Sequence, residues 1–237
     1  MPAPAQPRAV RILALETTEA LGSVAAMCDC NLLAQLTLDS RQRSAQSLLP
    51  AVKALLEQVG WRPNEVDLVA VTVGPGSFTG LRVGVTAAKT FAYAVEADIL
   101  GVDTLEAIAA AAPEEVNTLA VAVDAQRGDV VAALFRRGSD GWFEPTAPAQ
   151  LVSADAWLCG LPAGTCISGP ALRKLSGRVP EGLTVLDPQL WAPTADAVAR
   201  LAARYYAAGR RDDLWTLVPR YCRRSAAEEK WEKRDEG

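Results

Sequence analysis

The amino-acid sequence predicts an α/β protein made of two related halves. A strand–turn–strand pattern occupies residues 10–28, and a similar pattern returns at residues 118–135. Between them, the valine-rich run 66–73 is typical of a strand that is buried on both faces. Residues 48–59 carry apolar side chains at helical spacing, which predicts a helix with one buried side. Strands that alternate with helices in this way favour sheets covered by helices.

The composition predicts a folded, water-soluble chain. Of the 237 residues, 50% are hydrophobic and 22% are charged, which is ordinary for a globular protein. The formal net charge of −4 disfavours nucleic-acid binding by the chain on its own. No run approaches the roughly 18 consecutive apolar residues of a membrane helix, and no secretory signal is visible. Five scattered cysteines argue against a disulfide framework, so we expect a cytoplasmic protein.

The chain contains no histidine. This excludes catalysis by Ser-His-Asp or Cys-His arrangements and every zinc or iron site that uses imidazole ligands. A site made only of cysteine or carboxylate ligands finds no CxxC pair and no acidic cluster in the sequence. We therefore expect no metal, no cofactor and no catalytic residue in this chain.

The first half reads as a meander followed by a helix. Residues 10–28 predict two strands joined by a polar turn at 16–22, and residues 32–38 predict a third strand beside them. The helix at 48–59 follows, and its apolar stripe includes Leu48, Val52 and Leu55.

The segment GPGSFTG at residues 74–80 joins the valine-rich strand to a helix that we expect at 79–95. Glycines and the free N–H groups of a helix start can cradle a phosphate at such a junction. However, the loop lacks the Lys-Ser/Thr pair of a Walker loop and the third glycine of a GxGxxG fingerprint. A tight turn is therefore the favoured interpretation. The residues of the alternative, a phosphate or nucleotide loop, would be Gly74, Gly76, Ser77, Thr79 and Gly80.

Four small residues form a bare stripe along the same helix: Gly80, Gly84, Ala88 and Ala92 recur every four positions. Glycine inside a helix costs roughly 1 kcal/mol against alanine, so close approach of another backbone is the expected gain. Two alternatives fit this spacing equally. The stripe packs against this chain's own sheet or helix, or it forms an interface with another subunit, to which helix 48–59 would contribute a second element.

The second half repeats the opening hairpin, after a short strand at 99–102 and a helix at 104–112. Chance similarity of two apolar hairpins is one interpretation. The other is duplication of a βββ-αβαβ unit, as in actin-like folds, which would divide the chain into residues 1–103 and 104–237. Short strands near 150–152, 165–168 and 183–186 and a helix at 195–208 complete the second half, and we expect the last helix or tail to pack back on the first.

Two carboxylates end corresponding strands of the two hairpins. Glu16 and Asp124, with Thr17 beside the first, could bind Mg²⁺ or position a water in an actin-like cleft. Carboxylates at strand ends are more often solvated or capping groups, so we interpret these three residues as a vestigial cleft. An actin-fold ATPase or small-molecule kinase that uses Glu16, Asp124 and the loop 74–80 remains the alternative.

The stretch AVTVGPGSFTGLRVGVTAAKTFAYA, at residues 70–94, closely resembles the signature of the TsaB family of threonylcarbamoyladenosine biosynthesis proteins. The segments ILALETTEALGSVAA, SAQSLLPAVKALL, GVDTLEAIA, VDAQRGDVVAALF and LVPRYCRRSAAEE resemble other parts of that family. Two positions depart from the pattern, because Glu16 replaces an aspartate and Arg43 stands where a histidine is expected.

The resemblance implies an actin-like ATPase (ASKHA) fold, with two related subdomains that each open with an antiparallel βββ meander on a mixed sheet flanked by helices. It also implies a non-catalytic partner of the transferase TsaD and the ATPase TsaE. Together they would modify the adenosine 3′ of the anticodon in tRNAs reading ANN codons, so that tRNA contact is indirect. By motif position, the partner-binding helices would be 47–59 and 79–95. The sequence leaves open whether the isolated chain forms a homodimer.

Overall fold

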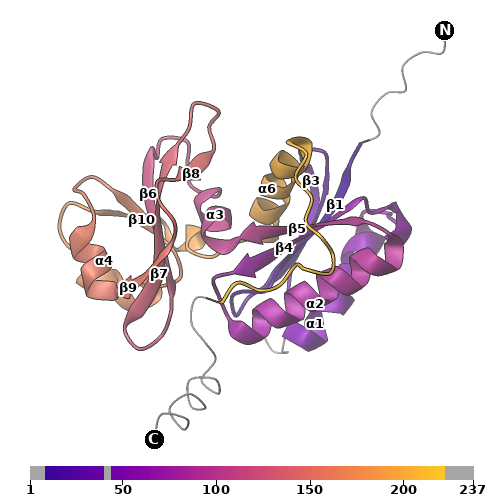
Figure 1. Ribbon diagram of the computed structural model, residues 1–237, viewed down its shortest axis with the longest axis horizontal. Coiled ribbons are helices and arrows are strands. Elements are labelled where there is room, and N and C mark those ends of the chain that lie inside the picture. Colours follow the sequence, from indigo (N-terminus) through magenta and orange to yellow (C-terminus); the bar gives the residue numbers. More distant parts are fainter. Residues whose placement is uncertain (1–8, 40–43, 222–237) are drawn as a thin grey trace, which may run out of the picture.

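The computed structural model of the chain describes residues 9–39 and 44–221. It contains two β-sheets that lie side by side, each with helices on both faces (Figure 1). No helix among the described residues is both long and apolar enough to cross a membrane.

The first sheet has the strand order β3-β2-β1-β4-β5. β1 pairs antiparallel with β2 and parallel with β4, while β3 extends the antiparallel side and β5 the parallel side. The bounds of these strands are β1 (Arg11–Glu16), β2 (Ser23–Cys28), β3 (Asn31–Thr37), β4 (Leu68–Gly74) and β5 (Asp98–Asp103).

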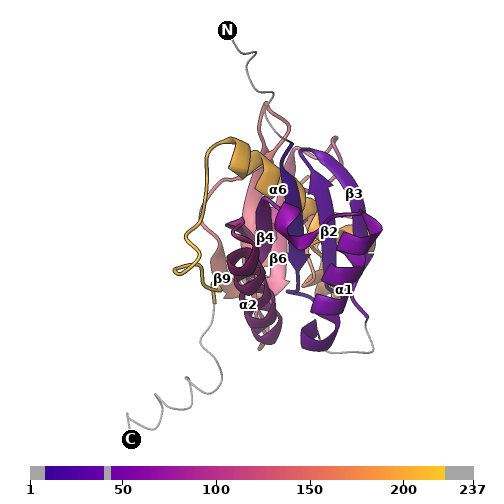
Figure 2. The same ribbon diagram turned by 90° about the vertical axis from the view of Figure 1, so that its right-hand side faces the viewer.

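Helices cover both faces of the first sheet. One face carries α1 (Ser44–Gln58) and α2 (Phe78–Val95), and the other carries α6 (Ala195–Ala207), as Figures 1 and 2 show. Successive side chains of a strand point to opposite faces, so Leu13 and Leu15 pack with α1 and α2, whereas Ile12 and Ala14 pack with α6. Burial on both faces explains why the central residues of β1 and nearly all of β4 are apolar. We call this sheet with its three helices the first lobe.

The second sheet repeats the first. Its order from one edge is β8-β7-β6-β10-β11, with two antiparallel pairings followed by two parallel ones, as in β3-β2-β1-β4-β5. This agreement favours duplication over chance similarity and confirms the predicted actin-like α/β architecture. The bounds are β6 (Thr118–Asp124), β7 (Asp129–Arg137), β8 (Phe143–Pro145), β10 (Cys166–Ser168) and β11 (Thr184–Val185), and β9 (Gln150–Ser153) pairs with β7 off this path.

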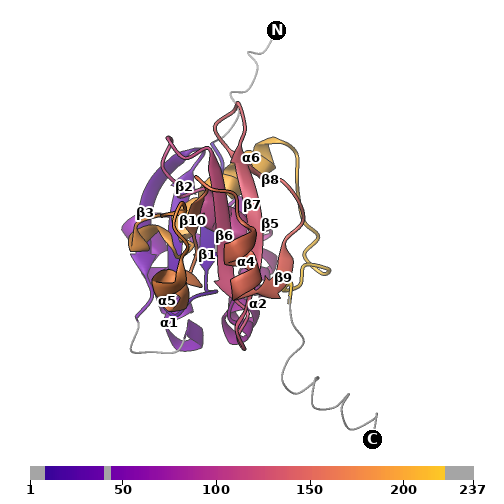
Figure 3. The same cartoon turned by 90° about the vertical axis from the view of Figure 1, so that its left-hand side faces the viewer.

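The second sheet and the helices that pack on it form the second lobe, and these helices are short. α3 (Thr104–Ala109) packs on one face of the second sheet (Figure 1). α4 (Ala154–Gly160) and α5 (Leu172–Leu175) pack on the other face (Figure 3). Short 3₁₀ turns lie at Pro63–Glu65, Ser176–Arg178 and Pro188–Leu190. The sequence did not predict β8, α4 or α5. The division of the chain at residue 103 stays a prediction.

The segment after α6, residues 208–221, runs along the edge strand β5 and the outer side of α2 (Figure 1). Asp212 N–H donates to the Ile99 carbonyl at 3.1 Å, and Arg220 N–H donates to the Val73 carbonyl at 2.7 Å. Lys89 Nζ donates to the carbonyls of Trp215 and Leu217 at 3.1 and 3.0 Å. The segment thereby covers a sheet edge that would otherwise expose unpaired backbone groups.

Candidate functional site

A cleft of about 1020 Å³ lies between the two lobes. The first lobe contributes the turn after β1 and the loop between β4 and α2. The second lobe contributes the end of β6 and the start of α5, and the C-terminal segment closes one side. The residues that the argument uses are Thr17, Thr18, Glu19, Asp124, Arg173 and Lys174.

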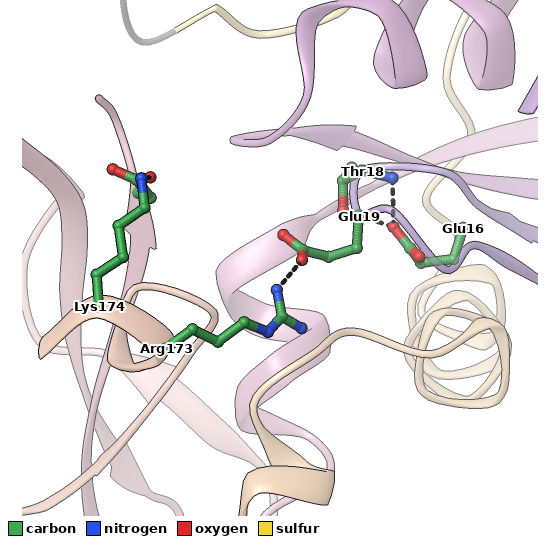
Figure 4. A network of polar contacts seen from close by, with 6 residues as sticks. Glu16, Thr18, Glu19, Arg173 and Lys174 are labelled. Carbon is green, nitrogen blue, oxygen red and sulfur yellow. Dashed lines mark hydrogen bonds and ion pairs between the residues drawn. The ribbon is translucent and has the colours of Figure 1, made fainter. Parts of the chain in front are cut away.

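Glu16 does not line this cleft. Its side chain is fully buried on the face that packs against α6, following Ile12 and Ala14 in the alternation of β1. Its Oε1 accepts hydrogen bonds from the Thr18 N–H at 2.6 Å and the Thr18 hydroxyl at 2.5 Å (Figure 4). Among the described residues, Oε2 has no hydrogen-bond partner. Loss of hydration on burial raises the pKa of Glu16 to about 8, although the two Thr18 hydrogen bonds oppose the shift.

Of the three residues assigned to a vestigial cleft, Thr17 and Asp124 line the cleft and Glu16 lies behind it. Asp124 forms an ion pair with Lys174 and accepts a hydrogen bond from Gln126 N–H at 2.9 Å. The structure therefore does not bring the two carboxylates together around one ion. No group of three or more acidic or cysteine side chains that could hold a metal occurs among residues 9–39 and 44–221.

Gly76 and Gly80 of the loop 74–80 fit closely against the turn after β1. A Cβ on Gly76 would lie 2.5 Å from Thr18 Cβ, and one on Gly80 would lie 1.9 Å from the Thr17 carbonyl oxygen. Thr17 Oγ1 donates to the Gly80 carbonyl at 2.8 Å, and Ser77 N–H donates to the Thr18 carbonyl at 3.0 Å. These contacts require glycine without any phosphate, which supports the tight-turn interpretation.

The side chains of this loop differ in their access to the cleft. Ser77 caps α2, because its hydroxyl accepts from the Gly80 N–H at 3.2 Å, and both Ser77 and Thr79 are exposed at the cleft. Gly74 has a φ of +122° and approaches the Arg220 carbonyl oxygen, which a Cβ would meet at 2.4 Å. The close approach of the C-terminal segment thus explains why position 74 requires glycine.

The seven residues predicted at a partner interface are buried inside this chain. On α2, Gly84 meets the Thr17 hydroxyl, to which a Cβ would be only 2.2 Å distant. Internal packing is therefore the alternative that the structure favours for the stripe, since a residue closed off by its own fold cannot touch another subunit. The buried residues are Leu48, Val52, Leu55, Gly80, Gly84, Ala88 and Ala92.

The outward sides of α1 and α2 remain exposed. The two helices contact each other and lie side by side on the outer face of the first lobe (Figure 2). Their exposed side chains are small or apolar at several adjacent turns, and Leu49 is 59% exposed. We call this surface the outer helical face and define it by Leu49, Pro50, Ala54, Thr86 and Thr90. Arg43, the other departure from the family pattern, lies outside the described residues.

Sequence reasoning missed the charged pair that spans the cleft. Glu19, in the turn after β1, forms an ion pair with Arg173 of α5 (Figure 4). Lys174, beside Arg173, forms an ion pair with Asp124. No local sequence pattern marks Arg173 or Lys174 as functional residues. Only the folded chain brings Glu19 next to a residue 154 positions away.

Several known proteins that are similar to this chain carry names from threonylcarbamoyladenosine biosynthesis. The family described as TsaD, tRNA N6-adenosine threonylcarbamoyltransferase, matches residues 33–174. The TsaB protein of Escherichia coli is 29% identical over 94% of this chain and 98% of its own length. The TsaB protein of Bacillus subtilis is 31% identical over 62% of this chain, and the match spans 64% of that relative. An uncharacterised protein of Mycobacterium tuberculosis is 31% identical over 81% of both chains.

Comparison with solved structures supports the same family assignment. YeaZ from Pseudomonas aeruginosa superposes with a TM-score of 0.80 at 26% identity, covering 90% of this chain and 99% of that one. The activator of 2-hydroxyisocaproyl-CoA dehydratase from Clostridium difficile, solved with bound ADPNP, reaches a TM-score of 0.50 at 11% identity over 86% and 99% of the two chains, which shows a shared fold only. From its sequence matches and its architecture together, this chain belongs to the TsaB/YeaZ family.

Proposed function

We propose that this chain is a non-catalytic subunit in the biosynthesis of threonylcarbamoyladenosine in tRNA. Relatives from two bacteria carry the name of that pathway. The observation that supports a non-catalytic role is the state of Glu16 and Asp124, the two carboxylates that the sequence suggested for a catalytic cleft. Glu16 is buried behind the cleft, and Asp124 is paired with Lys174, so neither is available as a metal ligand or a general base.

The proposed partners are a TsaD-like catalytic subunit and a TsaE-like ATPase in the cytoplasm, with tRNA bound through the assembly. The modified base would be the adenosine 3′ of the anticodon in ANN-decoding tRNAs. A net charge of −4 supports indirect contact, because the chain offers no broad positive field to the phosphate backbone.

The proposed docking surface for the catalytic subunit is the outer helical face. Small side chains such as Ala54 and Thr86 allow helices of a partner to approach closely, and Leu49 offers an apolar anchor. The buried glycine stripe supports this proposal, because it packs α2 closely against Thr17. This packing fixes which side of α2 faces outward. The proposal therefore keeps the two predicted helices, α1 and α2, and replaces the predicted contact residues with the exposed residues of the outer helical face.

Arginine on the outer helical face should break the complex and leave the chain folded. We expect Ala54→Arg and Thr86→Arg each to weaken binding of the TsaD-like subunit by about tenfold or more, because an unpaired charge would be buried at the interface. Titration calorimetry measures the affinity, and circular dichroism checks the fold. Ala207→Arg, on an exposed position of α6, is the matched control and should bind normally.

The transferase assay tests the proposed role itself. Mixed with both partner subunits, the chain should support tRNA modification, and without the TsaD-like subunit it should support none. Wild-type affinity in both arginine variants would exclude this docking surface, whereas modification of tRNA by the isolated chain would overturn the non-catalytic role.

A further inference from the structure

We propose that the ion pair between Glu19 and Arg173 is a latch that holds the two lobes closed over the cleft. Glu19 belongs to the turn between β1 and β2 of the first lobe, and Arg173 belongs to α5 of the second lobe. Both residues line the cleft, and Figure 4 shows their side chains meeting across it.

The first-lobe end of the latch is held rigidly. Thr18, next to Glu19, donates from its N–H and its hydroxyl to Glu16 Oε1, while its carbonyl accepts from the Ser77 N–H. Thr17 Oγ1 donates to the Gly80 carbonyl. The Glu19 side chain is only 14% exposed, so its carboxylate has little freedom to turn away from the second lobe.

The second-lobe end is anchored as well. The side chains on either side of Arg173 and Lys174, Leu172 and Leu175, are buried in the core beside β6 and α4. Lys174 pairs with Asp124 at the end of β6, which ties α5 to its own sheet. Exposed ion pairs are weak when two free side chains must be ordered to form them. Here the fold already holds the Glu19 side chain and the backbone of α5 in place, which favours a persistent pair.

The chain passes between the lobes at two places, and neither includes Glu19 or Arg173. β5 leads directly into α3 at Asp103, and the chain returns to the first lobe between Trp191 and Ala195. Two chain crossings of this kind can serve as a hinge, and a contact across the cleft then controls rotation about it. Because the turn that carries Glu19 also holds the first turn of α2, the latch connects the second lobe to the proposed docking helix.

The latch is tested by charge reversal and charge exchange. In Glu19→Arg and Arg173→Glu, we expect the ratio of open to closed molecules to rise by about fivefold or more, since the attraction is replaced by repulsion. The double variant Glu19→Arg/Arg173→Glu restores a pair of opposite charges and should return the ratio towards wild type. Unnatural spin-labelled residues at the exposed positions Leu21 and Ser176 report the distance across the cleft by pulsed electron resonance.

Arg178→Glu is the matched control. Arg178 is 50% exposed, close to the 52% of Arg173, but its ion-pair partner Asp155 lies in the same lobe. Reversal at Arg178 should therefore leave the distance distribution unchanged. Thermal unfolding of each variant confirms that it is folded. The latch is overturned if both single reversals retain the wild-type distribution, or if the charge exchange fails to restore it. The measurement uses the isolated chain, so its result is independent of the proposed partner.

Discussion

Alanine in place of Gly80 should destabilise the folded chain by at least about 3 kcal/mol. The new Cβ would lie 1.9 Å from the Thr17 carbonyl oxygen and 3.1 Å from the Thr17 carbonyl carbon. Relief would require the turn after β1 to move away from α2. That movement would break the hydrogen bonds from Thr17 Oγ1 to the Gly80 carbonyl and from Ser77 N–H to the Thr18 carbonyl. For a chain of this size we expect the unfolding temperature to fall by roughly 10 °C.

Gly160→Ala provides the control for this substitution. Gly160 ends α4, and a Cβ there would meet nothing within 4 Å. We expect its stability to be unchanged or higher by up to about 1 kcal/mol, because alanine favours helix. Urea unfolding of both variants gives the comparison. Equal stability of Gly80→Ala and wild type would show that the turn after β1 can move away from α2 at little cost. The rigid packing of α2 against Thr17 would then be refuted.

The glycine stripe shows what spacing can and cannot determine. The repeat of Gly80 and Gly84 correctly indicates close approach of another segment to one side of the helix. It does not identify that segment, since a small residue accepts any neighbour. The neighbour is Thr17, 63 positions before Gly80. Consequently Gly84→Arg would unfold the first lobe and not test docking, because even a Cβ at Gly84 would lie 2.2 Å from Thr17 Oγ1.

Long periodic elements were predicted well, and short or long-range features were not. The paired hairpins are visible because their strands are nearly continuous apolar runs, as expected for burial on both faces. α5 spans only Leu172–Leu175 and buries two leucines, which is too short for any helical period to appear. The Glu19–Arg173 pair joins residues from two lobes, and no local pattern predicts such a contact. Glu16 was predicted at the end of a strand, but its direction depends on which face of β1 meets α6.

The buried carboxyl of Glu16 should make the stability of the chain depend on pH. Burial raises the pKa of Glu16 in the folded chain to about 8, from an ordinary value of 4.5. Between these values the folded state keeps the proton and the unfolded state has lost it. Unfolding therefore releases a proton, and the free energy of unfolding falls as pH rises, by about 1.4 kcal/mol per pH unit. Asp103, whose pKa burial raises to about 6, acts with the same sign at lower pH, and its remaining contribution above pH 6 is common to the wild type and to a variant at Glu16.

Glu16→Gln should remove most of this dependence. Glutamine is neutral at every pH, and its amide oxygen can still accept the two hydrogen bonds from Thr18. From pH 6 to pH 8 we expect the wild-type free energy of unfolding to fall by roughly 2 kcal/mol more than that of the variant, measured by urea unfolding at each pH. Glu65→Gln is the control. A backbone hydrogen bond from Arg62 lowers the pKa of Glu65 to about 2, so this carboxylate is ionised in both states throughout the window. Parallel pH profiles for wild type and Glu16→Gln would mean that Glu16 is charged in the folded chain. The raised pKa that we attribute to burial of this carboxyl beneath α6 would then be refuted.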